Sequence, residues 1–311
     1  MLSKPNQPKG AALLVVLIIA IIMTILMSVA SVAMSKRLAL AFEAQNIFDE
    51  KVKIENKLSE LSYLLATQRI TVAGVSQGTN VNGTKVDDDG LFLVDIIGDE
   101  LRTDGFMYTE NGISFSIQNE SGLIPFNTSD NYWIKKLLTA YKEDNFSQIR
   151  LTNSLIDYAD ADNWRQPSGA EKKEYEKLSF PEPPNFLLQK CQELYAVLNW
   201  PRLLNSHPDI TNFCSLRRTA MINLNAVPLK LWQILWPQSQ QKISQLRNTN
   251  KWFTTLSDAT FAEPSFNSEV DTYLSVLGGY WYQLRFETKN QIYKLRIKIG
   301  NDTAKPVTVY H

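Results

Sequence analysis

The sequence is poor in the residues on which most enzymes and zinc proteins depend. Its 311 residues include two histidines, His207 and His311, and two cysteines, Cys191 and Cys214. So few of these residues make a histidine-based triad or a zinc site hard to assemble, and no glycine-rich phosphate loop is present. Lysine plus arginine and aspartate plus glutamate both total 32, so no basic excess indicates nucleic acid. We therefore expect a protein that is not an enzyme and does not bind nucleic acid.

The two cysteines leave two alternatives open. In an oxidising compartment Cys191 and Cys214 can form a disulfide, for which the loop-closure entropy predicts about 3 kcal/mol of stabilisation. The other alternative is two unrelated buried thiols. The sequence does not decide between them, because it does not give the distance between the two residues.

Charge is absent from a long apolar run near the start of the chain. Residues 11–34 carry no charged side chain, and their only polar side chains are Thr24, Ser28 and Ser31. A helix of this length spans about 36 Å, enough to cross a hydrocarbon core of ~30 Å. The ten residues before it contain Lys4 and Lys9 and no acid. The pattern predicts a single transmembrane helix at 11–34.

Three interpretations compete for this start. A secretory signal peptide would be cleaved near Ser31-Val32-Ala33, but the apolar run is longer than such peptides have. A plain single-span anchor fits the length. In the third, the cleavage-like signal, Lys9-Gly10-Ala11, lies before the apolar run. This arrangement resembles the class III leader of type IV pilins and type II secretion pseudopilins. The resemblance implies that prepilin peptidase cuts after Gly10 and that Ala11 becomes the methylated N-terminus.

The residue at the fifth position after Gly10 narrows the resemblance to one type of subunit within that family. Most members of that family have a glutamate there, held to pair with the N-terminal amine of a neighbouring subunit, whereas this chain has Val15. A carboxylate in an apolar helix is costly, so the family keeps it only for a function. Because this chain has no carboxylate at that position, it lacks the assembly contact with the amine. In lacking the glutamate, the chain is similar to the K-type minor pseudopilin of the type II secretion system.

The pattern after the membrane predicts a stem helix and then strands. Apolar residues step by three, four or seven from Leu40 to Leu65, so the helix is expected to reach about residue 68 and to pack on a sheet. Residues 74–90 are expected to form a surface loop and 91–97 a strand. Residues 105–109 and 113–118 flank Asn111-Gly112, which predicts a β-hairpin.

A long helical block follows, and then the pattern returns to strands. Helices are predicted from Ser129 or Asp130 to about 141, from Ser147 onward, and at 185–198, 228–236, 239–248 and 250–259. Strands are predicted at 269–276, 280–288 and 291–299, with Lys289-Asn290 as a turn. The predicted fold is α+β: a long N-terminal transmembrane and stem helix on an antiparallel pilin-like sheet, with a large inserted α-helical domain. The predicted segments are the leader 1–10, the span 11–34, the stem and first strands 35–128, the helical domain 129–264 and the last strands 265–311.

Four acidic residues in the helical block are the candidate metal ligands. Asp157, Asp160, Asp162 and Glu171 offer oxygen atoms of the kind that Ca²⁺ prefers, without the spacing of an EF-hand. The alternative is that these acids cap helices and form exposed salt bridges. A pair of glycosidase carboxylates finds little support, because nothing in the sequence fixes the distance between two of the carboxyl groups. The segment is similar to the acidic segment of the K family. Further landmarks of that family are matched by Pro184-Asn185, residues 192–194 and residues 221–226. Another landmark is matched only in part, by residues 119–127. The resemblance implies calcium in this domain.

The same resemblance implies a function. A minor pseudopilin of the K type would cap the tip of the type II secretion pseudopilus and support protein export across the outer membrane. It would be anchored in the bacterial inner membrane with its globular part in the periplasm. Its partners would be the I-type and J-type minor pseudopilins, the pseudopilus and prepilin peptidase. The alternatives are a type IV pilus minor pilin and an unrelated single-span periplasmic binding protein.

Overall fold

The computed structural model describes residues 11–78, 96–268, 270–300 and 306–310. Within it the chain forms two units, one that ends at Lys57 and one that begins at Leu58. Gly10 and the predicted leader lie outside the described residues, as do most of the predicted loop at 74–90 and most of the strand predicted at 91–97.

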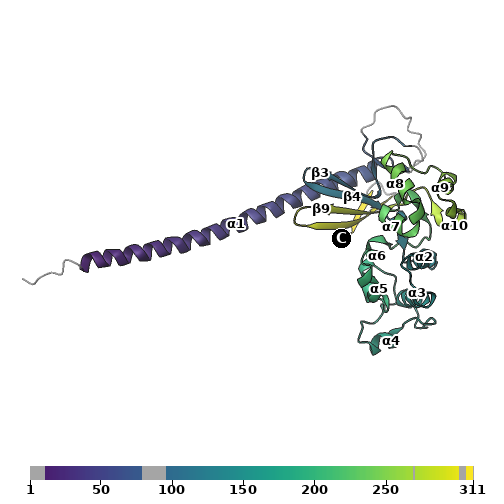
Figure 1. Cartoon of the computed structure of the whole chain (residues 1–311), viewed down its shortest axis with the longest axis horizontal. Helices are drawn as coiled ribbons and strands as arrows, with labels where there is room; N and C mark the ends of the chain where they lie inside the picture. The colour runs from purple at the N-terminus through teal and green to yellow at the C-terminus, as the bar shows by residue number, and fades with distance from the viewer. Residues whose placement is uncertain (1–10, 79–95, 269, 301–305, 311) are drawn as a thin grey trace, which may run out of the picture. The chain divides into compact units, whose positions relative to one another are not determined.

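The first element is the helix α1, Ala11–Thr67, and its end agrees with the predicted end near residue 68 (Figure 1). In the described part of the chain it is the one helix long and apolar enough to cross a membrane. The Thr24 hydroxyl donates to the Ala20 carbonyl at 2.7 Å, so this polar group is satisfied within its own helix. That arrangement suits a helix in lipid, where an unpaired polar group is costly.

The apolar stripe of α1 is buried only in its second half, where Ile54 is 3% exposed. Leu40 is 64% exposed, whereas Leu61 and Leu65 are fully buried in the second unit. The prediction that the whole stripe forms core contacts is therefore wrong for its first half.

The central sheet has five antiparallel strands in the order β11-β10-β9-β4-β3. Figure 1 labels three of them, β3, β4 and β9. One face is apolar, because Ile117 on β4 stands opposite Leu284 on β9, which stands opposite Leu295 on β10. The strands β4 and β9 are neighbours although residues 120–280 separate them in sequence. The bounds are β3 Asp104–Glu110, β4 Ile113–Asn119, β9 Trp281–Glu287, β10 Ile292–Ile299 and β11 Val307–Tyr310.

The predicted hairpin is formed by β3 and β4. Asn111 and Gly112 have positive φ angles of 51° and 80°, as the turn that suits this dipeptide requires. The pairing of β3 and β4 shifts register between Asp104 and Met107, a bulge that includes Gly105 at φ 77°. A local turn signal was therefore sufficient to predict this hairpin.

Several short strand pairs were not predicted. β1 Gly74–Ser76 pairs with β2 Glu100–Arg102, so the predicted loop at 74–90 begins as a strand. Two further pairs are parallel, with two residues in each strand: β5 Ile124–Pro125 with β6 Cys214–Ser215, and β7 Ile222–Asn223 with β8 Leu274–Ser275. Strands this short carry no periodic pattern that a sequence can show.

The block between β4 and β9 is largely helical and has a core rich in tryptophan. Trp133, Trp200, Trp232 and Trp236 are buried in it together with aliphatic side chains. Edge-to-face contacts join the rings of Trp133 and Trp236, whose centroids are 5.8 Å apart. The α-helices are α2 Tyr132–Ala140, α3 Asn145–Ala159, α4 Lys172–Lys177, α5 Trp200–Ser206, α6 Ile210–Phe213, α7 Leu229–Leu235, α8 Gln240–Asn248, α9 Leu256–Ala262 and α10 Val270–Tyr273.

Four helix and strand predictions in this block need correction. The α3 helix is capped by Asp144, which accepts from the Ser147 amide at 2.8 Å, and not by Ser147. The helix predicted at 185–198 is reduced to the 3-10 turn η2, Cys191–Ala196, since Asn185 has a positive φ. The helix predicted at 250–259 begins later, at α9, where Thr255 and Asp258 form a capping box. The strand predicted at 269–276 is α10 followed by β8.

A disulfide joins Cys191 in η2 to Cys214 in β6, with their Cα atoms 5.9 Å apart. It resolves the alternatives that the sequence left open. The bond closes a loop across a sequence separation of 23 residues. Constraint of the unfolded chain by a loop of this size is expected to contribute about 3 kcal/mol. It ties η2 to β6 across a segment that also contains α5 and α6.

The family landmarks meet where the sheet joins the helical block. Gly122, in η1 (Glu120–Gly122), lies so close to η3 (Leu224–Ala226) that a Cβ on it would be 2.1 Å from the Ala226 carbonyl oxygen. Only glycine permits this approach of two backbones. The Asn119 side chain donates to the Gly279 carbonyl at 2.9 Å. These landmarks therefore build the joint between the two parts of the second unit.

A buried ion pair crosses the same joint. The Glu120 carboxylate is fully buried and accepts two hydrogen bonds from Arg296 on β10, at 2.6 Å from Nε and 2.8 Å from Nη2. Arg217 donates from Nε to the Glu120 carbonyl oxygen at 3.0 Å. Burial lowers the pKa of Arg217 to about 10, although Glu120 opposes the shift. The joint is thus held by charges as well as by close backbone contact.

Candidate metal centre

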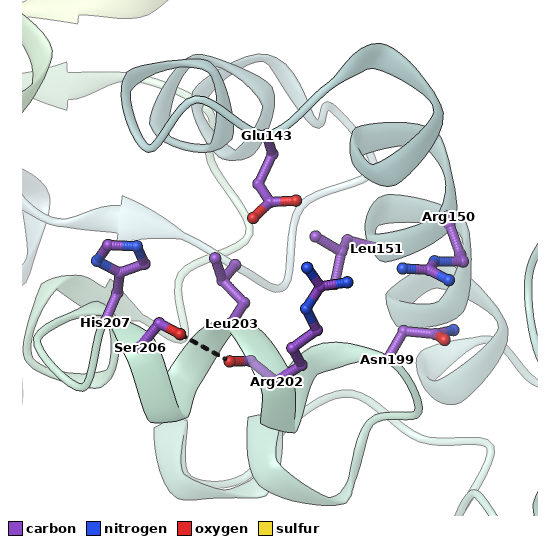
Figure 2. A pocket seen from close by; sticks show the side chains of 8 residues that line it. All are labelled: Glu143, Arg150, Leu151, Asn199, Arg202, Leu203, Ser206 and His207. Carbon is purple, nitrogen blue, oxygen red and sulfur yellow. Dashed lines mark hydrogen bonds between the residues drawn. The ribbon is translucent and has the colours of Figure 1, made fainter.

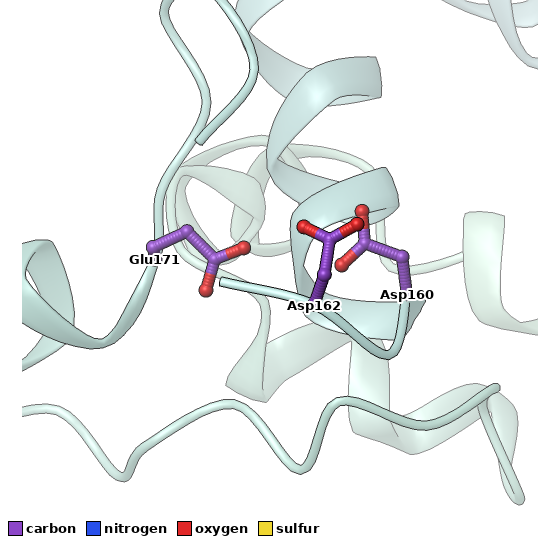
Figure 3. A group of neighbouring side chains, drawn as sticks. All are labelled: Asp160, Asp162 and Glu171. Atoms are coloured by element: carbon purple, nitrogen blue, oxygen red, sulfur yellow. The ribbon is translucent and has the colours of Figure 1, made fainter. Parts of the chain in front are cut away.

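The candidate metal centre lies where α3 ends and α4 begins. Asp157 is on the last turn of α3, Asp160 is its C-cap residue, and Asp162 follows in the turn. Glu171 is the N-cap residue of α4. The two helix ends therefore bring Asp160, Asp162 and Glu171, which span 11 positions in the sequence, into one small region (Figure 3).

Three of the four predicted ligands converge. One carboxylate oxygen each from Asp160, Asp162 and Glu171 lies within 4.8 Å of the others (Figure 3). Two oxygens that bind one Ca²⁺ at its usual distance are at most about 5.2 Å apart. The spacing of the three carboxylates therefore suits a single ion. Asp157 is not part of this group.

Asp157 stands apart from the three converging acids. It is fully buried, and its Oδ1 accepts from the Gln166 amide at 3.0 Å. A Cβ on Gly169 would lie 2.1 Å from its Oδ2, so the carboxylate occupies the space that a larger residue would take. Its Oδ2 has no hydrogen-bond partner in the described part of the chain.

The electrostatics of the centre are unfavourable without a cation. Burial, and then the charges of Asp157 and Asp160, raise the pKa of Glu171 to about 7. Burial followed by the charge of Asp162 also raises the pKa of Asp160. Asp160 Oδ1 and both carboxylate oxygens of Glu171 are buried without a hydrogen-bond partner among the described residues. Unpaired buried carboxylate oxygens are costly, and a bound cation would remove that cost.

The side chains of Arg165 and Asn185 do not neutralise these buried carboxylates. Arg165 forms an ion pair with Glu174 at 3.0 Å. Asn185 donates from Nδ2 to the Asp162 carbonyl oxygen at 2.9 Å and so fixes the backbone of the turn. Asp162 Oδ1 accepts from the Trp164 amide at 2.7 Å. The oxygen-only donor set therefore fits a hard cation such as Ca²⁺ and not the softer metals that favour nitrogen or sulfur.

Sequence reasoning missed two residues that shape this centre. Gly169 leaves room for Asp157, and Asn185 holds the turn that carries Asp162. The signal for Asn185 was present, since Pro184-Asn185 is one of the family landmarks. Nothing in the spacing of the acidic residues indicated that Asp157 would stand apart from the other three.

The predicted processing and assembly residues are at the other end of the chain. Ala11 is the first residue of α1, and Val15 lies on the same helix with 53% of its surface exposed. The roles predicted for Gly10, Ala11 and Val15 stay predictions.

Comparisons with known proteins agree with the sequence resemblance. Residues 117–204 match the family model described as type II secretion system (T2SS), protein K. No curated protein matches the chain. Five chains of solved structures match. One of these is from the crystal structure of the GspK-GspI-GspJ complex of the enterotoxigenic Escherichia coli type 2 secretion system.

The structural match covers 88% of this chain and 97% of that chain, with a TM-score of 0.57 and 16% sequence identity. It confirms the predicted α+β fold with a long apolar N-terminal helix. The family model covers the segment from β4 to α5, which includes all four predicted metal ligands. The predicted resemblance to the K-type pseudopilins is confirmed by these two findings together.

Proposed function

We propose that this chain, a minor pseudopilin of the K type, caps the tip of a type II secretion pseudopilus and supports protein export across the outer membrane. The observation that carries the proposal is the helical block between β4 and β9, whose first part lies in the segment, residues 117–204, that matches the protein K family model. The proposed work is structural and not catalytic.

Two independent features support a position at the tip. Val15 offers no carboxylate to the N-terminal amine of a neighbouring subunit, so sites in the filament that need this buried pair are disfavoured. The helical block adds residues 120–280 to a small sheet protein, a bulk that would collide with neighbours in a tightly wound shaft. Both features allow one copy at an end and oppose repeated copies along the shaft.

The proposed localisation, partners and bound ion each rest on an observation. We propose an anchor in the inner membrane, which the long apolar helix supports, and a globular part in the periplasm, an oxidising compartment that the disulfide suits. The partners we propose are minor pseudopilins of the I and J types, with which the matched structure was crystallised. Asp160, Asp162 and Glu171 would hold a calcium ion, which would neutralise their carboxylates and tie the end of α3 to the start of α4.

Labelling of sheared pseudopili is expected to place this chain at filament ends only. A Gln241→Cys variant carries an exposed thiol on α8, and the native cysteines are protected by their disulfide. Maleimide-gold on this variant should appear at one end of a filament, with at most one copy. Label on a major pseudopilin serves as the control for the whole shaft. Gold distributed along the shaft, or gold on type IV pili, would contradict the proposal.

N-terminal mass spectrometry of the membrane-extracted protein is expected to find Ala11 as the first residue, carrying an N-methyl group. The expectation rests on Lys9-Gly10-Ala11, which stands ahead of the apolar run. A Gly10→Leu variant should keep the whole leader, because the peptidase would lose the residue at its cleavage site. Intact Met1 in the unaltered protein, or a start near Met34, would rule out processing of the pseudopilin type.

A further inference from the structure

A small pocket lies between α3 and α5, apart from the metal centre (Figure 2). Its volume is about 90 Å³. Leu151 and Leu203 form an apolar part of its lining, and charged and polar side chains form the rest. A cavity of roughly 150 Å³ accommodates benzene, so this pocket admits only the end group of a larger ligand.

Three charged side chains meet at the pocket without pairing. Arg150 from α3 and Arg202 from α5 point toward one another, and the Glu143 carboxylate points into the same space (Figure 2). Among the described residues none of the three forms an ion pair within 4.0 Å. The Nε of Arg150 is buried and has no hydrogen-bond partner there either. The Ser206 hydroxyl donates to the backbone carbonyl of Arg202 at 3.3 Å and not to a pocket ligand or a charged side chain.

The charge balance of the pocket selects the ligand. Two guanidinium groups and one carboxylate leave one net positive charge. Asp144 also interacts electrostatically with Arg150, but it is not part of the lining and accepts from the Ser147 amide at 2.8 Å. A carboxylate carries one negative charge, whereas a phosphate group carries about 1.5 to 2 at neutral pH. The pocket is therefore better matched to a carboxylate.

We propose that this pocket binds the carboxylate of a glutamate or aspartate side chain presented by a partner polypeptide. The guanidinium fork matches a carboxylate in two parallel hydrogen bonds, and Arg150 Nε is a donor left open for one of them. Leu151 and Leu203 contact the methylene groups of the entering side chain. Arg202 and Ser206 are exposed at the rim, so the backbone of the partner stays outside.

Protection of arginines from phenylglyoxal tests the proposal on the full chain in detergent micelles. The probe is the peptide acetyl-Ala-Glu-Ala-amide, and its glutamine counterpart is the neutral control. The glutamate peptide should slow modification of Arg150 and Arg202, read by mass spectrometry, and leave the exposed Arg218 unchanged. An Arg202→Gln variant should weaken this protection of Arg150 about tenfold, as expected for a charged hydrogen-bond partner. An Arg218→Gln variant should leave it as it was.

A Glu143→Gln variant separates a carboxylate site from a phosphate site. Inorganic phosphate should protect neither arginine in the unaltered chain but should protect both in this variant, because its pocket carries one more net positive charge. Equal protection by the glutamate and glutamine peptides would overturn the proposal. Protection of the unaltered chain by phosphate and not by the glutamate peptide would overturn it as well, since it would make the pocket a phosphate site.

Discussion

Replacing Glu120 by alanine is expected to lower the free energy of unfolding by about 3–5 kcal/mol, because it leaves the Arg296 guanidinium without its bidentate partner at a buried joint. The Glu120 carboxylate is fully buried, and it also accepts hydrogen bonds from Gln283 at 3.3 Å and Ser215 at 3.4 Å. Its loss therefore affects β9, β10 and β6 together. Denaturant titration of the full chain in detergent, read by fluorescence of the buried tryptophans, measures the effect.

An exposed ion pair on the same sheet is the matched control. Arg285 pairs with Glu287, whose side chain is 32% exposed. Glu287→Ala should cost less than about 1 kcal/mol, as is usual for surface pairs. Exchanging both partners, the buried Glu120 for leucine and the partly buried Arg296 for methionine, should recover much of the loss, since this pair then leaves no charge without its partner. A cost of Glu120→Ala no larger than that of Glu287→Ala would show that the buried pair does not hold the joint.

Withdrawal of calcium is expected to lower the melting temperature by about 10 °C. A ligand at a thousand times its dissociation constant stabilises a protein by about 4 kcal/mol, and about 2–4 °C is lost for each kcal/mol in a domain of this size. Scanning calorimetry of the full chain with calcium and with a chelator measures the shift. Asp160→Ala with Asp162→Ala should abolish the difference. Glu176→Ala with Glu182→Ala, which removes two exposed acids of the same segment, should keep it.

The pH dependence of the chelated protein is expected to reveal Glu171. Its pKa is raised from 4.5 to about 7 in the folded state, so the folded protein binds this proton more tightly than the unfolded chain does. Stability from this group is complete below pH ~4.5 and is lost as the pH rises through about 7. The chelated protein should therefore melt at a higher temperature at pH 5.5 than at pH 8. Melting that is the same with calcium and with chelator at pH 8 would favour helix caps as the role of these acids.

Sequence reasoning succeeded where the signal is local. The Asn111-Gly112 turn, the alternation along β9 and β10 and the apolar periodicity of α7 and α8 each predicted an element close to its observed bounds. The end of α1 was predicted to within one residue, at 68 against Thr67.

Sequence reasoning failed where packing decides the structure. The two-residue strands β5 to β8 exist only because their partners are held beside them. Glu120 and Arg296 are 176 residues apart, and neither has a local feature that predicts the other. At the candidate metal centre the sequence named four acids, but it could not show that three of them converge while Asp157 is turned toward Gly169.

The pairing of β4 with β9 also sets the order in which the chain can fold. The hairpin of β3 and β4 is complete at Asn119, but the strand that covers the open edge of β4 begins only at Trp281. At a synthesis rate of about 5–20 residues per second, that edge waits on the order of ten seconds or more for its partner. During this interval Phe115 and Ile117, which the finished sheet buries, face no neighbouring strand on that side. The helical block is thus synthesised entirely within the waiting time.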